Sequence, residues 1–181
     1  PQVPAPGVPA GATAAGGDGQ VTVSWNAVTG ASSYNLYMAA EPGVTKANYA
    51  SLPEGMRHAG VTSPVVHTGL TNGTAYYFVV TAVNASGESA ESAEVGATPD
   101  IAAPTGLIAT AGAAQVTLSW NAVGGATSYQ VYRSTISGAV GTVIASPTTT
   151  SYLDTSVTNG TSYYYRAASV GAGGEGTGLS S

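Results

Sequence analysis

Few residues in this chain have side chains that could carry out catalysis. Charged residues make up only 7% of the 181 positions, and the absence of cysteine excludes thiol nucleophiles, disulfides and thiolate metal sites. Histidine occurs only at His58 and His67. His67 could act as a base for a nearby serine, but no Gly-x-Ser-x-Gly motif in a strand-to-helix setting accompanies it. We therefore expect an exposed strand residue at His67 and a loop residue at His58, with no metal or cofactor site.

Paired carboxylates are the other candidate chemistry, since two facing acids can cleave a glycosidic bond. The nearest such group is Glu88, Glu91 and Glu94. Their spacing of three would place them on one face of a helix, but in a strand alternate residues face opposite ways. We expect them on the last turn and strand of a β-domain, as a solvated edge that discourages aggregation. The sequence thus predicts no catalytic residues and no enzyme.

The charge balance excludes two classes of partner. The net charge is −5, and the basic residues are Lys46, Arg57, Arg133 and Arg166. Nucleic acids and anionic membrane surfaces both require a basic face, which these four residues cannot form. No apolar run approaches the length of about 20 residues that spans a bilayer. The chain starts at Pro1 without a signal-peptide pattern, so we expect a mature protein or an excised fragment, with no membrane insertion.

A long internal repeat divides the chain. The sequence Gln-Val-Thr-Val-Ser-Trp-Asn-Ala-Val at 20–28 recurs as Gln-Val-Thr-Leu-Ser-Trp-Asn-Ala-Val at 115–123. Thr-Asn-Gly-Thr also occurs twice, and the first copy carries an insertion between Met38 and Leu70. Two copies of this size indicate tandem domains. We expect domain 1, with a proline-rich N-terminal extension, at residues 1–99 and domain 2 at residues 100–181.

Within each copy apolar residues alternate with polar ones, which is typical of strands with one buried face. Val21, Val23 and Trp25 share one face of such a strand, and the pattern returns at 34–38 and 76–82. Turn residues separate the strands, and no stretch has helical periodicity. The sequence predicts an all-β protein made of two tandem sandwiches with seven strands each.

Several of these motifs resemble the fibronectin type III family of immunoglobulin-like sandwiches. They are the early tryptophans Trp25 and Trp120, the Tyr-x-Leu/Val-Tyr strand that follows, and the Thr-Asn-Gly-Thr-x-Tyr motifs that end at Tyr76 and Tyr163. The chain is similar over nearly its whole length to such repeats in large exported bacterial proteins. This resemblance implies that the two tryptophans are core residues and that the two tyrosines form the tyrosine corner, in which the phenol bonds upstream backbone.

Four further tyrosines alternate with the core-facing residues of their strands and are therefore expected on the outer face of two neighbouring strands: Tyr37, Tyr77, Tyr132 and Tyr164. They would form one pair on each domain. Cross-strand aromatic packing explains such pairs structurally. The alternative is a ligand surface, because exposed rings bind sugars in many domains.

Domain 2 lacks part of its last strand. Residues 176–181 align with 89–94, and nothing follows that matches 95–99. An incomplete last strand exposes a sheet edge, which is a template for another strand. Residues beyond Ser181, a segment of a neighbouring subunit that brings self-association, or solvent could complete this edge.

The resemblance implies a secreted or cell-surface bacterial protein and leaves three functions open. The first is a non-catalytic structural spacer or adhesive, interaction module. The second is a carbohydrate-binding accessory module of an extracellular hydrolase, and the third is a subunit of an extracellular polymer completed by strand exchange. The expected partners are proteins or polysaccharides, and no nucleic acid.

Overall fold

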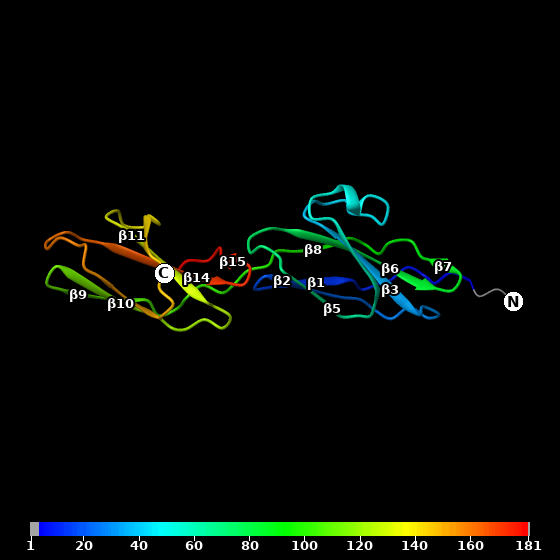
Figure 1. Cartoon of the computed structure of the whole chain (residues 1–181), viewed down its shortest axis with the longest axis horizontal. Helices are drawn as coiled ribbons and strands as arrows, with labels where there is room; N and C mark the ends of the chain where they lie inside the picture. The colour runs from blue at the N-terminus through cyan, green and yellow to red at the C-terminus, as the bar shows by residue number, and fades with distance from the viewer. Residues whose placement is uncertain (1–3, 181) are drawn as a thin grey trace. The chain divides into compact units, whose positions relative to one another are not determined.

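The computed structural model describes residues 4–180 and is all-β apart from one short 3-10 helix, η1 (Tyr49–Ser51). Pro1, the start of the proline-rich extension, and Ser181 lie outside the described residues. The chain forms two compact units (Figure 1): the first runs to Pro99 without Thr71–Gly73, and the second comprises Thr71–Gly73 and the residues from Asp100 onward. No helix in the described part has the length and hydropathy needed to cross a bilayer.

Domain 1 is a sandwich of two antiparallel sheets. The first sheet has the order β1-β2-β5 and the second β4-β3-β6-β7, with β8 also paired to β6. Their bounds are β1 (Thr13–Gly17), β2 (Gln20–Ser24), β3 (Ser33–Ala39), β4 (Met56–Val61), β5 (Val65–Thr68), β6 (Tyr76–Asn84), β7 (Gly87–Glu88) and β8 (Val95–Ala97).

Domain 2 repeats this order, with sheets β13-β10-β9 and β12-β11-β14-β15. The bounds are β9 (Ile108–Gly112), β10 (Gln115–Ser119), β11 (Ser128–Ser134), β12 (Thr142–Ala145), β13 (Ser151–Asp154), β14 (Tyr164–Gly171) and β15 (Gly174–Glu175). Because β7 and β8 are two halves of one last strand, both described domains have seven strands. The predicted fold class is confirmed.

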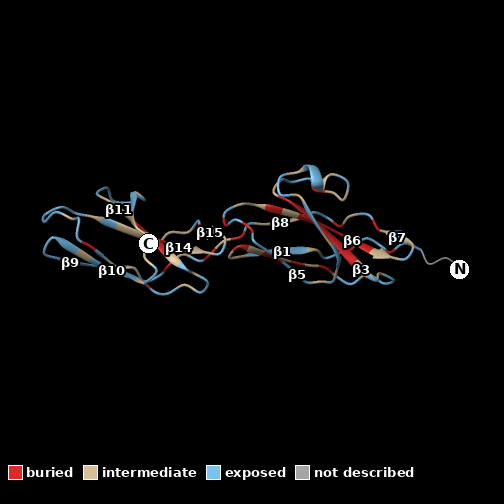
Figure 2. Cartoon of the chain, viewed as in Figure 1, coloured by how far each residue is buried: buried red, intermediate tan, exposed pale blue. Residues whose placement is uncertain are grey.

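Figure 2 shows buried residues along β3 and β6 in domain 1 and in β14 in domain 2. Each core also contains a tryptophan directly after the second strand of its domain. Trp25 and Trp120 are both 5% exposed. Trp25 packs edge-on against Tyr34, and Trp120 packs in the same way against Tyr129, with ring centroids 5.3 Å apart in both pairs. Such edge-to-face pairs add to the stabilisation from burial alone. The alternation of the sequence thus places the same ring pair at the centre of both sandwiches.

The two tyrosines expected at the corner have different hydrogen bonds. The backbone N–H of Thr158 donates to the Tyr163 hydroxyl at 3.2 Å, which is the return bond to upstream backbone that the resemblance implies. Tyr76 is fully buried, and its hydroxyl donates to Glu54 Oε2 at 2.9 Å. Glu54 lies in the insertion, so Tyr76 also ties this segment to the sandwich.

We expect Tyr76→Phe to lower the free energy of unfolding of domain 1 by about 1–2 kcal/mol, because the ring stays while a hydrogen bond to a carboxylate is lost. Urea unfolding of the whole chain measures this change. Glu54→Gln keeps an acceptor for the hydroxyl and should cost less. A neutral result for Tyr76→Phe would show that the bond to Glu54 does not stabilise the fold.

The last strand ends differently in the two domains. In domain 1 the side chains of Ser89 and Ser92 accept from the backbone N–H groups of Ala82 and Val80, and β8 then pairs with Tyr76–Phe78. In domain 2 Ser180 exchanges equivalent bonds with Ala167, at 2.8 and 2.7 Å. Among residues 4–180, nothing pairs with the outer side of β14 ahead of Ala167. The described part of domain 2 thus has no counterpart of β8.

Candidate functional site

Two carboxylates beside the last strand of domain 1 accept hydrogen bonds from the insertion. Glu94 Oε2 accepts from the backbone N–H groups of Gly43 and Val44, at 2.7 and 2.9 Å. Glu91 Oε1 accepts from the backbone N–H of Lys46 at 3.1 Å. Glu94 is exposed and Glu91 is partly exposed, so this edge is solvated as expected, and its carboxylates also hold the insertion, whose turn offers N–H donors.

Glu88 is the centre of a polar cluster on the outer face of the same sheet. Its Oε1 accepts from Tyr37 Oη at 2.7 Å, from Asn35 Nδ2 at 3.0 Å and from Thr81 Oγ1. Burial alone would raise the pKa of Glu88, but these hydrogen bonds and Lys46 outweigh burial and hold the pKa below its usual range. A carboxylate that stays ionised with all these donors cannot act as a general acid.

The two histidines form a hydrogen bond with each other. His58 Nε2 lies 2.7 Å from His67 Nδ1, and the rings are 4.7 Å apart. His67 is only 7% exposed, so the expectation of an exposed residue is wrong. The bond joins β4, at the edge of one sheet, to β5, at the edge of the other. Among residues 4–180, no group of three or more histidines and acids could hold a metal ion.

Burial lowers the pKa of His67, the neighbouring His58 lowers it further, and Glu54 acts in the opposite direction. The unfolded chain takes up this proton near a pKa of about 6.5. Between that value and the lower pKa of the folded state, the unfolded state binds more protons, so the stability of domain 1 rises with pH.

We expect the stability of domain 1 to fall as the pH is lowered from about 7 to about 5, while domain 2, which has no histidine, keeps its stability over this range. Hydrogen exchange of the whole chain, followed by mass spectrometry at several pH values, reports both domains at once. His67→Gln should remove most of the pH dependence. Equal losses in both domains would contradict the role of the histidine pair.

Domain 2 has an ion pair at the position where domain 1 has the histidine pair. His67 pairs with Val21 across the sheet, and Asp154 pairs with Val116 in the same way. Asp154 is fully buried, and its Oδ2 accepts from Arg133 Nη1 at 2.8 Å. Tyr165 and Ser156 also donate to this carboxylate. These partners satisfy the buried charge, so the cluster is structural.

The outer tyrosines of domain 1 are covered by the insertion. Tyr37 is 2% exposed and packs against Tyr49, with ring centroids 5.0 Å apart. Val44 and Leu52 complete the small apolar cluster, and Tyr77 packs against it. Both rings belong to this outer cluster and not to the core between the sheets, and the insertion covers Tyr37. The apolar residues of the insertion were the signal in the sequence that it packs onto this face.

The same face is open in domain 2, which has no such insertion. Tyr164 is 41% exposed, and the Tyr132 hydroxyl donates to Glu175. Burial, the bond to Glu175 and its charge raise the pKa of Tyr132 to about 12. Tyr132 lies opposite Arg166, and Tyr164 lies opposite Ser134. This surface, defined by Tyr132, Tyr164 and Arg166, is called the open tyrosine face below.

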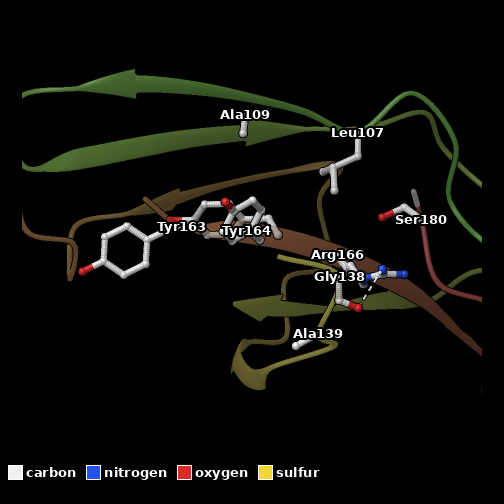
Figure 3. Close-up of a pocket in the computed structure, with 9 residues that line it drawn as sticks. Leu107, Ala109, Gly138, Ala139, Tyr163, Tyr164, Arg166 and Ser180 are labelled. Carbon is white, nitrogen blue, oxygen red and sulfur yellow. Dashed lines mark hydrogen bonds between the residues drawn. The ribbon is translucent and has the colours of Figure 1, made fainter. Parts of the chain in front are cut away.

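A groove runs along the unpaired edge of β14. It consists of two neighbouring cavities of about 290 and 360 Å³. Figure 3 shows Leu107 and Ala109 facing the strand that carries Tyr163 and Tyr164, with Ser180 near one end. The sequence indicated an open edge here, but not the depth of the groove.

A family model of the fibronectin type III domain matches residues 6–98. The chain belongs to the fibronectin type III family. In the strand names used for such sandwiches, Glu88, Glu91 and Glu94 lie on or beside strand G, and the insertion lies between strands C and C′. Neither feature resembles an active site, since every carboxylate in this group accepts hydrogen bonds within the domain.

Relatives extend the comparison to both fibronectin type III domains. Exoglucanase B from Cellulomonas fimi is 35% identical over 184 residues, which cover 89% of this chain and 15% of that protein. An amylopullulanase from Thermoanaerobacterium saccharolyticum is 44% identical over 68 residues, which cover 37% of this chain and 5% of that protein. The chain therefore spans only a small part of the length of these curated relatives.

A solved structure of two fibronectin type III domains from chicken tenascin has the same fold. Its TM-score is 0.53, at 17% sequence identity, and the match covers 94% of this chain and 97% of that one. At this identity the likeness concerns the fold alone.

Proposed function

We propose that this chain is a non-catalytic spacer and interaction module within a larger bacterial protein that degrades a polymer outside the cell. The observation that carries the proposal is the match of both domains to 15% of exoglucanase B. A region that small, repeated as two sandwiches, fits an accessory part of such a protein. Chitinase A1 from Niallia circulans matches in the same way, over 82% of this chain and 22% of that protein.

The chemistry of the described residues supports a role without catalysis. The acids that could have formed a pair hold the insertion or the outer polar cluster. The histidines bond each other, and the buried Asp154 has four hydrogen-bond donors from three residues. These groups stabilise the sandwiches, and a spacer requires nothing further from them.

A graft into exoglucanase B tests the spacer function. The matching region of that protein is deleted, or replaced by this chain, and hydrolysis of insoluble and soluble glucan is measured. We expect the deletion to lose activity on the insoluble substrate and the graft to restore it, while activity on soluble substrate stays constant. A graft that behaves like the deletion would contradict the proposal.

Polysaccharide binding by the open tyrosine face is the second candidate. The observation that favours it is the 41% exposure of Tyr164, whereas the insertion covers the equivalent face of domain 1. Tyrosine rings beside an arginine provide both stacking surface and hydrogen-bond donors. A sugar polymer with flat apolar ring faces fits such a surface.

Depletion by insoluble starch, cellulose and chitin separates the two candidates. A pure spacer stays in the supernatant with all three polymers, and so does its Tyr164→Ala variant. Depletion that Tyr164→Ala and Tyr132→Ala both abolish would favour the binding module. Tyr77→Ala in the covered face of domain 1 is the matched control, and it should leave any depletion unchanged.

A further inference from the structure

The two histidines of domain 1 face each other from two different sheets. His58 lies on β4 opposite the buried Leu36, and His67 lies on β5 opposite the buried Val21. Because side chains directly opposite each other share one face of a sheet, both imidazoles are on the inner faces of their sheets. Both β4 and β5 are edge strands. The pair therefore bridges the two sheets along one side of the sandwich.

The ring nitrogens of this pair are arranged like two ligands of one ion. His58 Nε2 lies 2.7 Å from His67 Nδ1, and the ring planes are inclined by 69°. One of these nitrogens carries the shared hydrogen, and the other offers its lone pair. Two imidazoles on a tetrahedral Zn²⁺ have their nitrogens about 3.3 Å apart, which is roughly 0.6 Å more than here. Since His58 is half-buried on an edge strand, a small rotation of its ring provides this room.

The charges around the pair favour a cation. Burial and the neighbouring His58 lower the pKa of His67, and the negative charge of Glu54 opposes both effects. The charge of Glu54 therefore acts at the imidazoles. Arg57 is next to His58 in the sequence but lies opposite Tyr37, so its side chain is on the other face of β4. An ion between the rings would thus be attracted by Glu54, with Arg57 directed away from it.

The backbone holds Glu54 in a fixed position. Its φ is 53°, in the left-handed region that residues other than glycine rarely adopt. Gly55 follows in close contact, since a Cβ added there would lie 1.6 Å from the carbonyl oxygen of Tyr49. Glu54 Oε2 accepts from the Tyr76 hydroxyl, and Oε1 has no hydrogen-bond partner among residues 4–180. This oxygen is available to a water molecule bound to an ion.

Domain 2 joins its sheets at the equivalent position without any need for an ion. Arg133 on β11 forms an ion pair with Asp154 on β13, and Asp154 corresponds to His67 in the cross-strand pairing. Two imidazoles instead contribute a single hydrogen bond. Imidazole is a preferred ligand of zinc, copper and nickel ions, whereas Mg²⁺ and Ca²⁺ prefer oxygen ligands. The histidine pair is therefore suited to a transition-metal ion.

We propose that His58 and His67 bind one divalent transition-metal ion of the Zn²⁺ type, and that this ion joins the two sheets of domain 1. The ion takes the place of the shared hydrogen, which moves to the remote nitrogen of its own ring, so both rings stay uncharged. Water molecules complete the coordination, and one of them lies between the ion and Glu54. With two protein ligands, the site binds more weakly than a closed structural zinc site, which has four.

The test uses the whole chain, made without a histidine tag, at a pH of about 7.5, above the usual pKa of histidine. Titration calorimetry gives the dissociation constant for Zn²⁺. At a free Zn²⁺ concentration of about ten times that constant, the slowest amides of β3 and β6 should exchange about tenfold more slowly, because the ion binds only the folded state. Domain 2, which has no histidine, should not change. No effect of millimolar Zn²⁺ on domain 1, or an equal effect of Mg²⁺, would overturn the proposal.

Three variants locate the ion, each compared with and without Zn²⁺ so that its own stability does not enter. His58→Gln removes a half-buried ligand and should abolish the slowing of exchange, and His67→Gln should do the same. Glu54→Gln keeps both ligands and should weaken binding without abolishing it. The ring NMR shifts of both histidines in the wild type should move with Zn²⁺, which requires no variant. Unmoved ring shifts, or protection that persists in His58→Gln, would place the ion elsewhere and overturn the proposal.

Discussion

Replacing Trp120 with alanine should lower the free energy of unfolding of domain 2 by about 3–5 kcal/mol, which is the usual cost of removing a buried large aromatic side chain. Trp120 is 5% exposed and packs against Tyr129. Its loss leaves a cavity in the middle of a core whose fully buried members are few. Since small domains have stabilities of this order, the variant could leave domain 2 unfolded at room temperature.

Hydrogen exchange, measured separately for the two domains, is the measurement that shows this loss. Fluorescence does not separate the domains, because both tryptophans contribute to the signal of the wild type. Trp25→Ala is the matched variant and should act on domain 1 in the same way. Trp120→Phe keeps most of the buried ring and should cost markedly less than alanine. If Trp120→Ala left the exchange of β10 and β14 unchanged, the tryptophan would not be the anchor of that core.

Replacing Asp154 with alanine should destabilise domain 2 by about 3 kcal/mol, because a buried charge on one partner is left uncompensated and several donors lose their acceptor. Asp154 is fully buried, while the side chain of Arg133 is 22% exposed. Water can therefore reach the arginine in the variant, which keeps the cost at the lower end for a broken buried pair. Tyr165 and Ser156 lose their acceptor as well.

The contribution of Asp154 also depends on pH. Burial raises the pKa of its carboxyl, but hydrogen bonds from Ser156, Arg133 and Tyr165 outweigh this and lower the pKa below its usual range. A folded pKa below the unfolded value means that the stabilisation is complete above a pH of about 4 and is lost as the pH falls further. Domain 1 should thus weaken near the pKa of histidine, and domain 2 only in stronger acid.

Urea unfolding of Asp154→Ala, Arg133→Met and the double variant measures the coupling in the pair. We expect the double variant to be less destabilised than the sum of the single changes, because neither charge is then left alone. Asp154→Asn keeps the shape and should fall between the wild type and the alanine variant. Additive changes would indicate that the pair contributes no coupling energy.

Alternation along the chain was enough to predict the strands and their inward faces. Val21, Val23 and Trp25 are 0%, 0% and 5% exposed, as a period of two with one buried face requires. The repeat then extended the assignment to domain 2, where Leu118 and Trp120 are 0% and 5% exposed. The shortened last strand of the given sequence was also visible from this alignment, because residues 176–181 match 89–94 and 95–99 have no counterpart in it.

What covers an outer face could not be predicted in this way. Tyr37 and Tyr132 occupy equivalent positions on equivalent strands. The insertion buries Tyr37, whereas domain 2 has no such insertion and Tyr132 is half-exposed. The carboxylates of Glu91 and Glu94 bind backbone groups of that insertion about 50 residues earlier in the chain. Such contacts depend on how a long loop folds back, which local periodicity does not describe.

The sequence by itself determined the fold family, the two sandwiches and their tryptophan cores, since these follow from short-range patterns that repeat. Only the tertiary structure decided that His67 bonds His58, that Asp154 pairs with Arg133, and that the edge of β14 opens into a groove. The physical reason is that a polar group next to the core is stable only when distant segments bring it a partner. In the same way, a groove exists only where neighbouring strands leave its walls uncovered.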